Sequence, residues 1–298
     1  MKELSRRKFI SKGTAVLSGV TIFGSGIINM SCAAPNTYTV DKVKLGKTGL
    51  KVSRIAMGTG TIGGNKQSNQ TRLGMETFVK MTHYAYERGI TFFDTADTYG
   101  SLPFVGNAVK NLPREKITIL SKIWTYDNGS KNTVPVDQTV DRLRKEANSD
   151  YLDILLMHCI MRGDWKDTRS FYMDGFSKAK QAGYVKAIGV SCHNKEALIE
   201  ASTNPWVDVI MARINPFTSK MDGSPEEITK ILEQAMKNGK GVIGMKIFGE
   251  GSHVADNERQ QSIEFAVKGK RVHCMTLGME SEAQVGDAID RTMKIVKG

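Results

Sequence analysis

Cysteine, proline and aromatic residues are scarce in this sequence, and their scarcity excludes several kinds of protein. Its 298 residues include 4 Cys and 7 Pro, and 7% of them are aromatic. Beyond Cys32, the cysteines are widely spaced, at Cys159, Cys192 and Cys274. They therefore suggest no disulfide framework and lack the close pairs of a zinc or iron–sulfur site. We expect no metal, and the 40% of hydrophobic residues indicates an ordinary globular core.

Clustered basic residues are also missing, although the formal net charge is +11. Residues 1–31 account for +4 of that charge, and the rest of the chain has no basic run longer than two residues. A nucleic-acid-binding surface usually needs a basic patch or stripe, so we expect no nucleic acid partner. A positive pocket for an anionic cofactor explains the mild excess of basic residues equally well.

The amino terminus contains no apolar run long enough to span a membrane stably. Its weakly apolar stretch, residues 13–28, is short and rich in Gly and Ser. Ser5-Arg-Arg-Lys-Phe-Ile10 precedes this stretch and closely resembles a twin-arginine export signal. We therefore interpret residues 1–32 as a targeting segment, which predicts a periplasmic protein, and leave them out of the fold. The alternative is a basic disordered tail.

Cys32 leaves two interpretations of the end of this segment. A lipoprotein signal places a lipidated cysteine after a small residue, which Ser31 provides, and three positions after an apolar one, which Asn29 does not provide. Lipidation of Cys32 would anchor the protein to a membrane. The alternative is simple cleavage near Ala33 and Ala34.

Short apolar runs alternate with helix-like segments throughout residues 38–298. Residues 43–57 first predict a β-hairpin that turns at residues 47–49 and leads into a strand. Strand-like runs occur at residues 54–57, 91–93, 117–120, 151–157, 185–190, 207–214, 241–247 and 271–275. Helix-like segments occur at residues 72–88, 103–111, 136–148, 170–181, 195–202, 225–237, 257–267 and 282–296. Eight such pairs predict an α/β fold, a (β/α)8 TIM barrel with an N-terminal β-hairpin. An open doubly wound sheet is disfavoured, because no Gly-x-Gly-x-x-Gly follows the first strand.

Ionisable residues follow three consecutive strand-like runs. Asp94, Lys122 and His158 each come at the end of such a run, and Tyr99 lies five residues beyond Asp94. Catalytic groups of parallel barrels collect at this edge. The Lys122 ammonium would lower the pKa of Tyr99, Asp94 would hold Lys122, and His158 would polarise a carbonyl oxygen. This set suits proton delivery to an oxygen as a hydride reaches carbon. Taken singly, Asp94 could instead cap a helix, and Asp94 and Lys122 could form a purely structural ion pair.

The motifs around these residues resemble the aldo-keto reductase family. They include Leu45-Gly-Lys-Thr-Gly-Leu-Lys-Val-Ser53, Gly89-Ile-Thr-Phe-Phe-Asp-Thr-Ala-Asp-Thr-Tyr-Gly100, Leu120-Ser-Lys122, Asp153-Ile-Leu-Leu-Met-His158 and Ile188-Gly-Val-Ser191. The matches follow the family's order from about residue 43 to residue 191. The resemblance implies an NAD(P)H-dependent oxidoreductase that interconverts a carbonyl compound and an alcohol. Tyr99 would be its general acid or base, tuned by Lys122 and Asp94, with His158 orienting the carbonyl.

The resemblance also implies residues that bind the cofactor, NADP or, as a second choice, NAD. Gly58 and Thr59 would lie near the nicotinamide, and Ser191 would hold its carboxamide. Lys246 stands where the family often has an aromatic residue. The pyrophosphate would approach Gly249 and Gly251, and the adenosine phosphate would lie near Gly278 and Gln284. Gln284 replaces the family's usual arginine, which weakens the expected grip on a 2′-phosphate.

The substrate is expected to be a small aldehyde, ketone or sugar. Trp124 and Trp165 lie in the two longer loops and are candidates for substrate contact, although either could instead pack beneath a loop. Two other functions stay open. One is a sensor or subunit that binds nicotinamide without turnover. The other is a redox-neutral epimerase or isomerase with a tightly held cofactor, which would suit an exported protein that meets little free NADPH.

Overall fold

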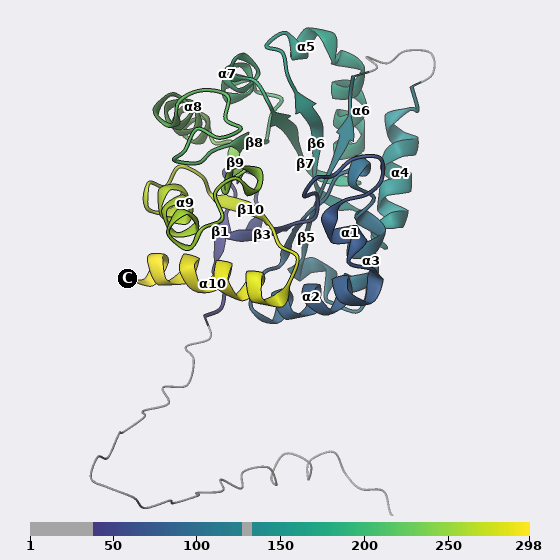
Figure 1. The fold of residues 1–298 in the computed structure, drawn as a ribbon. Helices are drawn as coiled ribbons and strands as arrows, with labels where there is room; N and C mark the ends of the chain where they lie inside the picture. Colours follow the sequence, from purple (N-terminus) through teal and green to yellow (C-terminus); the bar gives the residue numbers. More distant parts are fainter. Residues whose placement is uncertain (1–37, 127–132) are drawn as a thin grey trace, which may run out of the picture. The chain divides into compact units, whose positions relative to one another are not determined.

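The computed structural model describes residues 38–126 and 133–298, which fold as a closed parallel barrel (Figure 1). The strands neighbour one another in the order β10-β3-β4-β5-β6-β7-β8-β9, and β10 pairs with β9 to close the ring. They are β3 (Ile55–Gly58), β4 (Phe92–Asp94), β5 (Thr118–Trp124), β6 (Leu152–Ile160), β7 (Val185–Cys192), β8 (Val209–Arg213), β9 (Gly241–Met245) and β10 (Cys274–Gly278). The predicted barrel is confirmed. The targeting segment expected at residues 1–32, with Cys32, lies outside the described residues.

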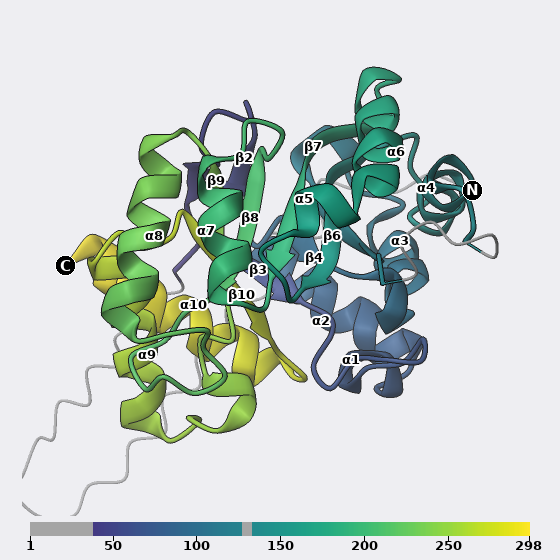
Figure 2. The same cartoon turned by 90° about the horizontal axis from the view of Figure 1, so that it is seen from above.

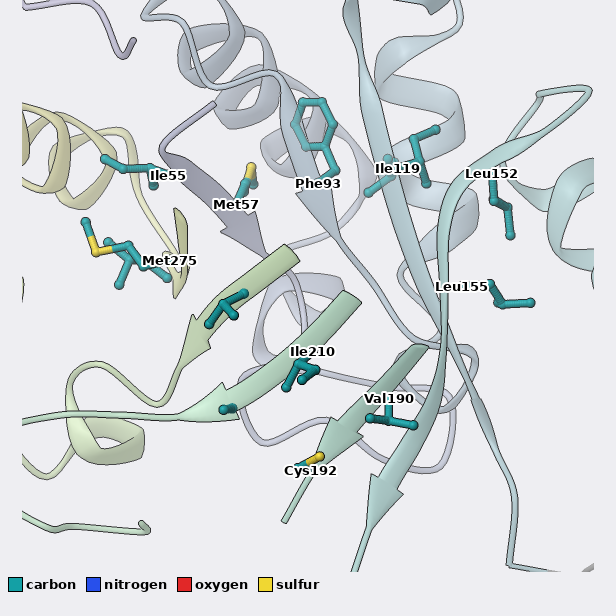
Figure 3. Close-up of a cluster of buried hydrophobic side chains, with 14 of the residues drawn as sticks. Ile55, Met57, Phe93, Ile119, Leu152, Leu155, Val190, Cys192, Ile210 and Met275 are labelled. Carbon is teal, nitrogen blue, oxygen red and sulfur yellow. The ribbon is translucent and has the colours of Figure 1, made fainter. Parts of the chain in front are cut away.

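Alternation of side chains along the strands builds two buried layers, because successive residues of a strand point to opposite faces. One layer fills the barrel interior, with members such as Phe92, Leu120 and Ile154. The other lies between the barrel and its helices; some of its members are drawn in Figure 3, among them Met57, Phe93, Ile119, Val190 and Ile210. The inward register also carries Asp94, Lys122 and His158, since they are two residues from Phe92, Leu120 and Leu156.

Helices surround the barrel (Figure 2). They are α1 (Asn69–Arg72), α2 (Met75–Glu87), α3 (Leu102–Val109), α4 (Val136–Glu146), α5 (Trp165–Thr168), α6 (Ser170–Gln181), α7 (Lys195–Thr203), α8 (Pro225–Lys237), α9 (Asp256–Lys268) and α10 (Glu282–Lys297). The described residues also form the 3-10 turns η2 (Asp97–Tyr99), η3 (Arg114–Lys116) and η4 (Gly249–Gly251). Within the described ranges, no helix has the length and apolar character needed to cross a membrane.

The prediction of a single helix at residues 72–88 is wrong for the first turn of that range. The chain forms α1 and then α2, and Gly74 separates them with a φ of 81°. That backbone conformation is open to glycine at little cost and ends a right-handed helix. The last barrel strand is also displaced, since β10 extends from Cys274 to Gly278 where the sequence pattern predicted residues 271–275.

The predicted hairpin closes the end of the barrel opposite the strands' carboxyl ends. Its strands are β1 (Lys42–Lys44) and β2 (Lys51–Ser53), paired antiparallel. Leu45 and Val52 are fully buried and join the apolar cluster of the barrel interior. A methyl group at Gly241 would lie 2.6 Å from Cγ of Leu45, so Leu45 packs directly on the start of β9. The site must therefore open at the other end.

Candidate active site at the carboxyl ends of the strands

A buried ion pair forms the base of the site. Lys122 of β5 pairs with Asp94, the last residue of β4, and their side chains are only 2% and 8% exposed. The Lys122 ammonium also donates a hydrogen bond of 2.7 Å to the Thr95 carbonyl oxygen. The second carboxylate oxygen of Asp94 accepts a hydrogen bond of 2.9 Å from Thr276 on β10. Three strands thus hold one ammonium in a fixed position.

Tyr99 lies above this pair, on the short turn η2. Its hydroxyl oxygen is 3.4 Å from Nε2 of His158, which comes from β6. The Lys122 ammonium nitrogen is 5.1 Å from the centroid of the Tyr99 ring. The structure therefore brings together all four residues of the expected catalytic set. Asp94 does not cap a helix, because its carboxylate is engaged by Lys122 and Thr276.

Two glycines that sequence reasoning missed shape the position of the Tyr99 ring. A methyl group at Gly60 would lie 2.1 Å from Cε2 of that ring, and one at Gly63 would lie 2.5 Å from Cδ1. Both distances are far inside van der Waals contact, so only glycine lets the ring lie where it does. The sequence signal that could have indicated them is the closely spaced glycines Gly58, Gly60 and Gly63 at the end of the first barrel strand. Thr276 was missed because the last strand was expected to end at Met275.

Burial controls the protonation states in the site. It raises the pKa of the Tyr99 phenol above its ordinary value of 10.0, and the charge of Asp94 adds to this. The pKa of Tyr99 is therefore raised overall, chiefly by burial. A lowering effect of Lys122 on this pKa stays a prediction. Burial also lowers the pKa of Lys122, an effect that the Asp94 carboxylate opposes. Tyr99 consequently keeps its proton at neutral pH.

His158 is neutral in this environment. Burial, followed by the charge of Lys122, holds its pKa well below the ordinary value of 6.5. Its Nδ1 lies 3.5 Å from Oγ1 of Thr98, at the outer limit of a hydrogen bond. A neutral imidazole can donate from only one nitrogen, so a proton on Nε2 points to the same place as the Tyr99 hydroxyl. His193, which directly follows β7, has its pKa lowered to about 3, chiefly by burial.

The two tryptophans expected to contact substrate differ in position. Trp124 ends β5, is 45% exposed, and meets the His158 ring edge-on with 5.7 Å between centroids. It stays a candidate for substrate contact. Trp165 is only 1% exposed, donates a hydrogen bond to the Ala197 carbonyl oxygen and packs near Trp206. Trp165, the first residue of α5, is therefore packed in the core, which is the alternative that the sequence left open, and substrate contact is not supported for it.

A groove of about 500 Å³, lined at its inner end by Asp94, Tyr99 and Lys122, extends to the first turns of α10. The predicted cofactor residues that line it are Gly58, Lys246, Gly251, Gly278 and Gln284. Lys246 forms an ion pair with Glu250, which also lines the groove and which sequence reasoning missed. Thr59 and Gly249 are not part of the lining. The Thr59 hydroxyl instead donates 2.8 Å to the Asp94 carbonyl oxygen, a structural role.

Ser191 stands apart from the lining as a buried polar side chain. It is 1% exposed, and its hydroxyl has no hydrogen-bond partner in the part of the chain that the structure describes. It pairs in register with Met211 of β8, which does line the groove. A buried hydroxyl without a partner is costly, so this one is suited to meet a polar group of a ligand.

Comparison with models of protein families shows to which family this chain belongs. The model of the Aldo/keto reductase family matches residues 54–290, which is most of the chain. The chain belongs to the aldo/keto reductase family. The match covers the whole barrel apart from the end of α10, and it includes the four residues at the strand ends.

Members of the family with assigned names are distant from this chain. An L-galactose dehydrogenase from Arabidopsis thaliana is 31% identical over 153 residues, 49% of this chain and 47% of the relative. An NADH-specific methylglyoxal reductase from Escherichia coli is 26% identical over 221 residues, 66% of this chain and 61% of the relative. An NAD(P)H-dependent D-xylose reductase from Candida tenuis is 24% identical over 216 residues, 63% of this chain and 64% of the relative. The chain thus spans about half to two thirds of the length of these curated relatives.

Solved structures of aldo-keto reductases share the fold. One from Bacillus halodurans, in its holo form, gives a TM-score of 0.66 at 18% identity, covering 87% of this chain and 96% of its own. Another, from Brucella melitensis, gives a TM-score of 0.64 at 20% identity, covering 87% of this chain and 99% of its own. At this level of identity, the likeness establishes the barrel architecture.

Several residues in or beside the groove of this family member have the character that a nicotinamide dinucleotide would need. The unpartnered hydroxyl of Ser191 suits an amide at the barrel end of the groove. Gly58 and Gly278 line the groove, and packing requires glycine at both positions, because a side chain would collide with Thr276 and Thr61, respectively. Gly251 has a φ of 94° and open space beside its Cα. These residues, with Lys246 and Gln284, would hold the cofactor.

Proposed function

We propose that this chain is an NAD(P)H-dependent oxidoreductase that interconverts a carbonyl compound and an alcohol. The observation that carries the proposal is the placement of the Tyr99 hydroxyl 3.4 Å from Nε2 of His158 at the inner end of the groove. Two hydrogen-bond donors that point to one place can hold a single carbonyl oxygen. Membership of the aldo/keto reductase family supports the same reaction class.

Each residue of the site has a distinct part in this reaction. A bound nicotinamide supplies or accepts the hydride at the carbonyl carbon. Tyr99 holds the proton at its hydroxyl and donates it to the carbonyl oxygen, while neutral His158 donates a hydrogen bond to the same oxygen. The phenolate left on Tyr99 is stabilised by the ammonium of Lys122, which Asp94 keeps in place. In alcohol oxidation the proton moves the other way.

The substrate proposed here is a small aldehyde, ketone or sugar. Trp124 offers an exposed aromatic surface beside His158, against which the apolar face of a sugar ring can pack. The names of the relatives also include methylglyoxal, D-xylose and L-galactose as substrates. A first panel should therefore hold methylglyoxal and simple aldoses.

The direct test follows oxidation of NADH and NADPH by the absorbance of the reduced nicotinamide, with each compound of the panel. We expect turnover with at least one carbonyl compound. If the protein binds cofactor but oxidises it with none of them, the result favours a nicotinamide-binding sensor. If it binds no dinucleotide at all, the proposal is wrong.

The resemblance of residues 5–10 to an export signal motivates a second part of the proposal. We propose that residues 1–32 direct twin-arginine export, with Cys32 as a candidate for lipidation, and that the protein works in the periplasm. Because this route carries folded proteins, a tightly held cofactor could travel inside the barrel and support a redox-neutral epimerisation or isomerisation. Gel filtration of the purified protein tests this: ready loss of the nicotinamide on dilution would argue against it.

A further inference from the structure

The outer end of the groove is acidic. The charged side chains that line it there are Glu280, just before α10, Asp287 on α10 and Arg259 on α9. Asp287 is paired with both Arg291 and Arg259, whereas Glu280 makes no ion pair within the described residues. A ligand group beside Glu280 therefore meets its negative charge unless Arg259 is free to offset it.

Arg259 is already engaged by protein groups. Its Nε lies 3.1 Å from a carboxylate oxygen of Asp287, and its Nη2 lies 3.2 Å from Asp256. Its Nη1 donates 2.6 Å to the Val254 carbonyl oxygen. Arg259 is therefore held by two ion pairs and by the Val254 carbonyl oxygen, although its buried Nε–H makes no hydrogen bond within the described residues. Turning the guanidinium towards a ligand phosphate would break the hydrogen bond to the Val254 carbonyl oxygen or the ion pairs with Asp256 and Asp287.

Glu280 is held in place but keeps one acceptor available. Its Oε1 accepts a hydrogen bond of 2.8 Å from Asn69 of α1, and its backbone N–H donates 2.7 Å to Gln284. Its Oε2 has no hydrogen-bond partner within residues 38–126 and 133–298. A fixed carboxylate with one free oxygen is well suited to accept from a hydroxyl group and poorly suited to an anion.

We infer that Glu280 makes this groove select NADH over NADPH. In the doubly wound dinucleotide-binding fold, an acidic residue accepts from the free 2′-hydroxyl of the adenosine ribose, whereas an arginine accommodates a 2′-phosphate. The same charge argument applies to a carboxylate at the end of this groove. Like charges brought together at a binding site oppose the wrong partner strongly. The inference rests on the proposed function and reverses the preference for NADP expected from the family resemblance.

The experiment uses two fragments of the cofactor that differ only in the group at the 2′-position of the adenosine ribose. ADP-ribose and 2′-phospho-ADP-ribose are titrated into the full chain by isothermal calorimetry, so no turnover is required. We expect ADP-ribose to bind at least about tenfold more tightly, a difference equivalent to roughly 1.4 kcal/mol. Raising the salt concentration should narrow the difference, because it screens the repulsion.

Two variants test whether the selectivity for ADP-ribose comes from the carboxylate of Glu280. Glu280→Gln removes the charge but keeps an oxygen for Asn69, so it should strengthen binding of 2′-phospho-ADP-ribose by about tenfold and weaken ADP-ribose slightly. Glu282→Gln is the matched control. Glu282 lies two residues away, faces Lys80 at 3.9 Å and does not line the groove, so neither affinity should change.

The outcomes separate this inference from the proposed function. Tighter binding of 2′-phospho-ADP-ribose to the unaltered protein, or an equal effect of both variants, overturns the role of Glu280 while leaving the oxidoreductase intact. Binding of neither fragment overturns both. Selectivity for ADP-ribose that disappears only in Glu280→Gln supports the inference.

Discussion

At the scale of single residues, the site depends on the buried ammonium of Lys122, whose charge would be costly to bury without a partner. Lys122 is almost completely buried, and its charge is balanced by Asp94 and by the Thr95 carbonyl oxygen. A buried ion pair of this kind adds little net stability, but breaking it leaves the remaining charge without compensation. The ion pair between Lys122 and Asp94 therefore contributes both to the stability of the fold and to the geometry of the site.

Replacing Lys122 with methionine tests this dependence. The substitution leaves the Asp94 carboxylate buried with only Thr276 as a partner, so we expect the free energy of unfolding to fall by about 3 kcal/mol. Urea denaturation measures the change. Arg162→Ala, which breaks the exposed pair with Asp164, should leave the unfolding midpoint unaltered. Equal effects of the two substitutions would contradict the account.

Gly60 supplies a second prediction at this scale. The Gly60→Ala methyl group would displace the Tyr99 ring, and a shift of this size should lower kcat by about 100-fold. The control is Gly64→Ala on the same loop, where an added methyl group meets nothing within 4 Å. Steady-state kinetics with the best substrate compares the two. Unchanged kcat in Gly60→Ala would show that the ring is not held by this contact.

The residues at the strand ends could be predicted from sequence because their spacing places them on one edge of a parallel sheet. Asp94, Lys122 and His158 follow apolar runs, and the alternation of each strand aims them inward. Trp165 could not be predicted in the same way, since a loop tryptophan gives no sign of whether it faces the solvent or the core. The pKa of Tyr99 was also out of reach, because it depends on burial that only the folded structure shows.

At the scale of elements, most helices and strands follow directly from the periodicity of the sequence. The predicted helices at residues 170–181 and 225–237 match α6 and α8 at both ends, and α8 begins with Ser224 as its capping residue. The division between α1 and α2 was missed, because one glycine inside an apolar helical pattern is weak evidence for a break. Short elements such as α5 and η2 have too few residues to show a period.

The hairpin gives a prediction that separates stability from binding. Leu45→Ala would leave a cavity at the closed end of the barrel and should lower the free energy of unfolding by about 3 kcal/mol. The affinity for the nicotinamide cofactor should not change, because the groove opens at the opposite end. Lys51→Ala on the exposed side of β2 is the control. Denaturation and calorimetric titration together measure both quantities.

At the scale of the whole molecule, the chain combines a barrel that suits reduced cofactors with a segment that predicts export. Residues 1–32 lie outside the described residues, so the proposal for them rests on Ser5-Arg-Arg-Lys-Phe-Ile10 and Cys32 alone. Replacing Arg6 and Arg7 with lysine should retain the protein in the cytoplasm. Cell fractionation with immunoblotting measures this, and Lys2→Arg serves as the control.

Lipid anchoring is tested separately in the same cells. Cys32→Ala should move an anchored protein from the membrane fraction to the soluble periplasmic fraction. A protein that is soluble in both forms would show that Cys32 is not lipidated, while leaving export by the twin-arginine route unaffected.

The central claim is that Tyr99 delivers the proton in carbonyl reduction. The most direct measurement compares the unaltered protein with Tyr99→Phe, both in turnover of the best carbonyl substrate and in calorimetric binding of the cofactor. The phenyl ring keeps the packing against Gly60 and Gly63 but has no hydroxyl. The account predicts a loss of at least about 100-fold in kcat with cofactor affinity retained. Unchanged turnover in Tyr99→Phe would contradict it.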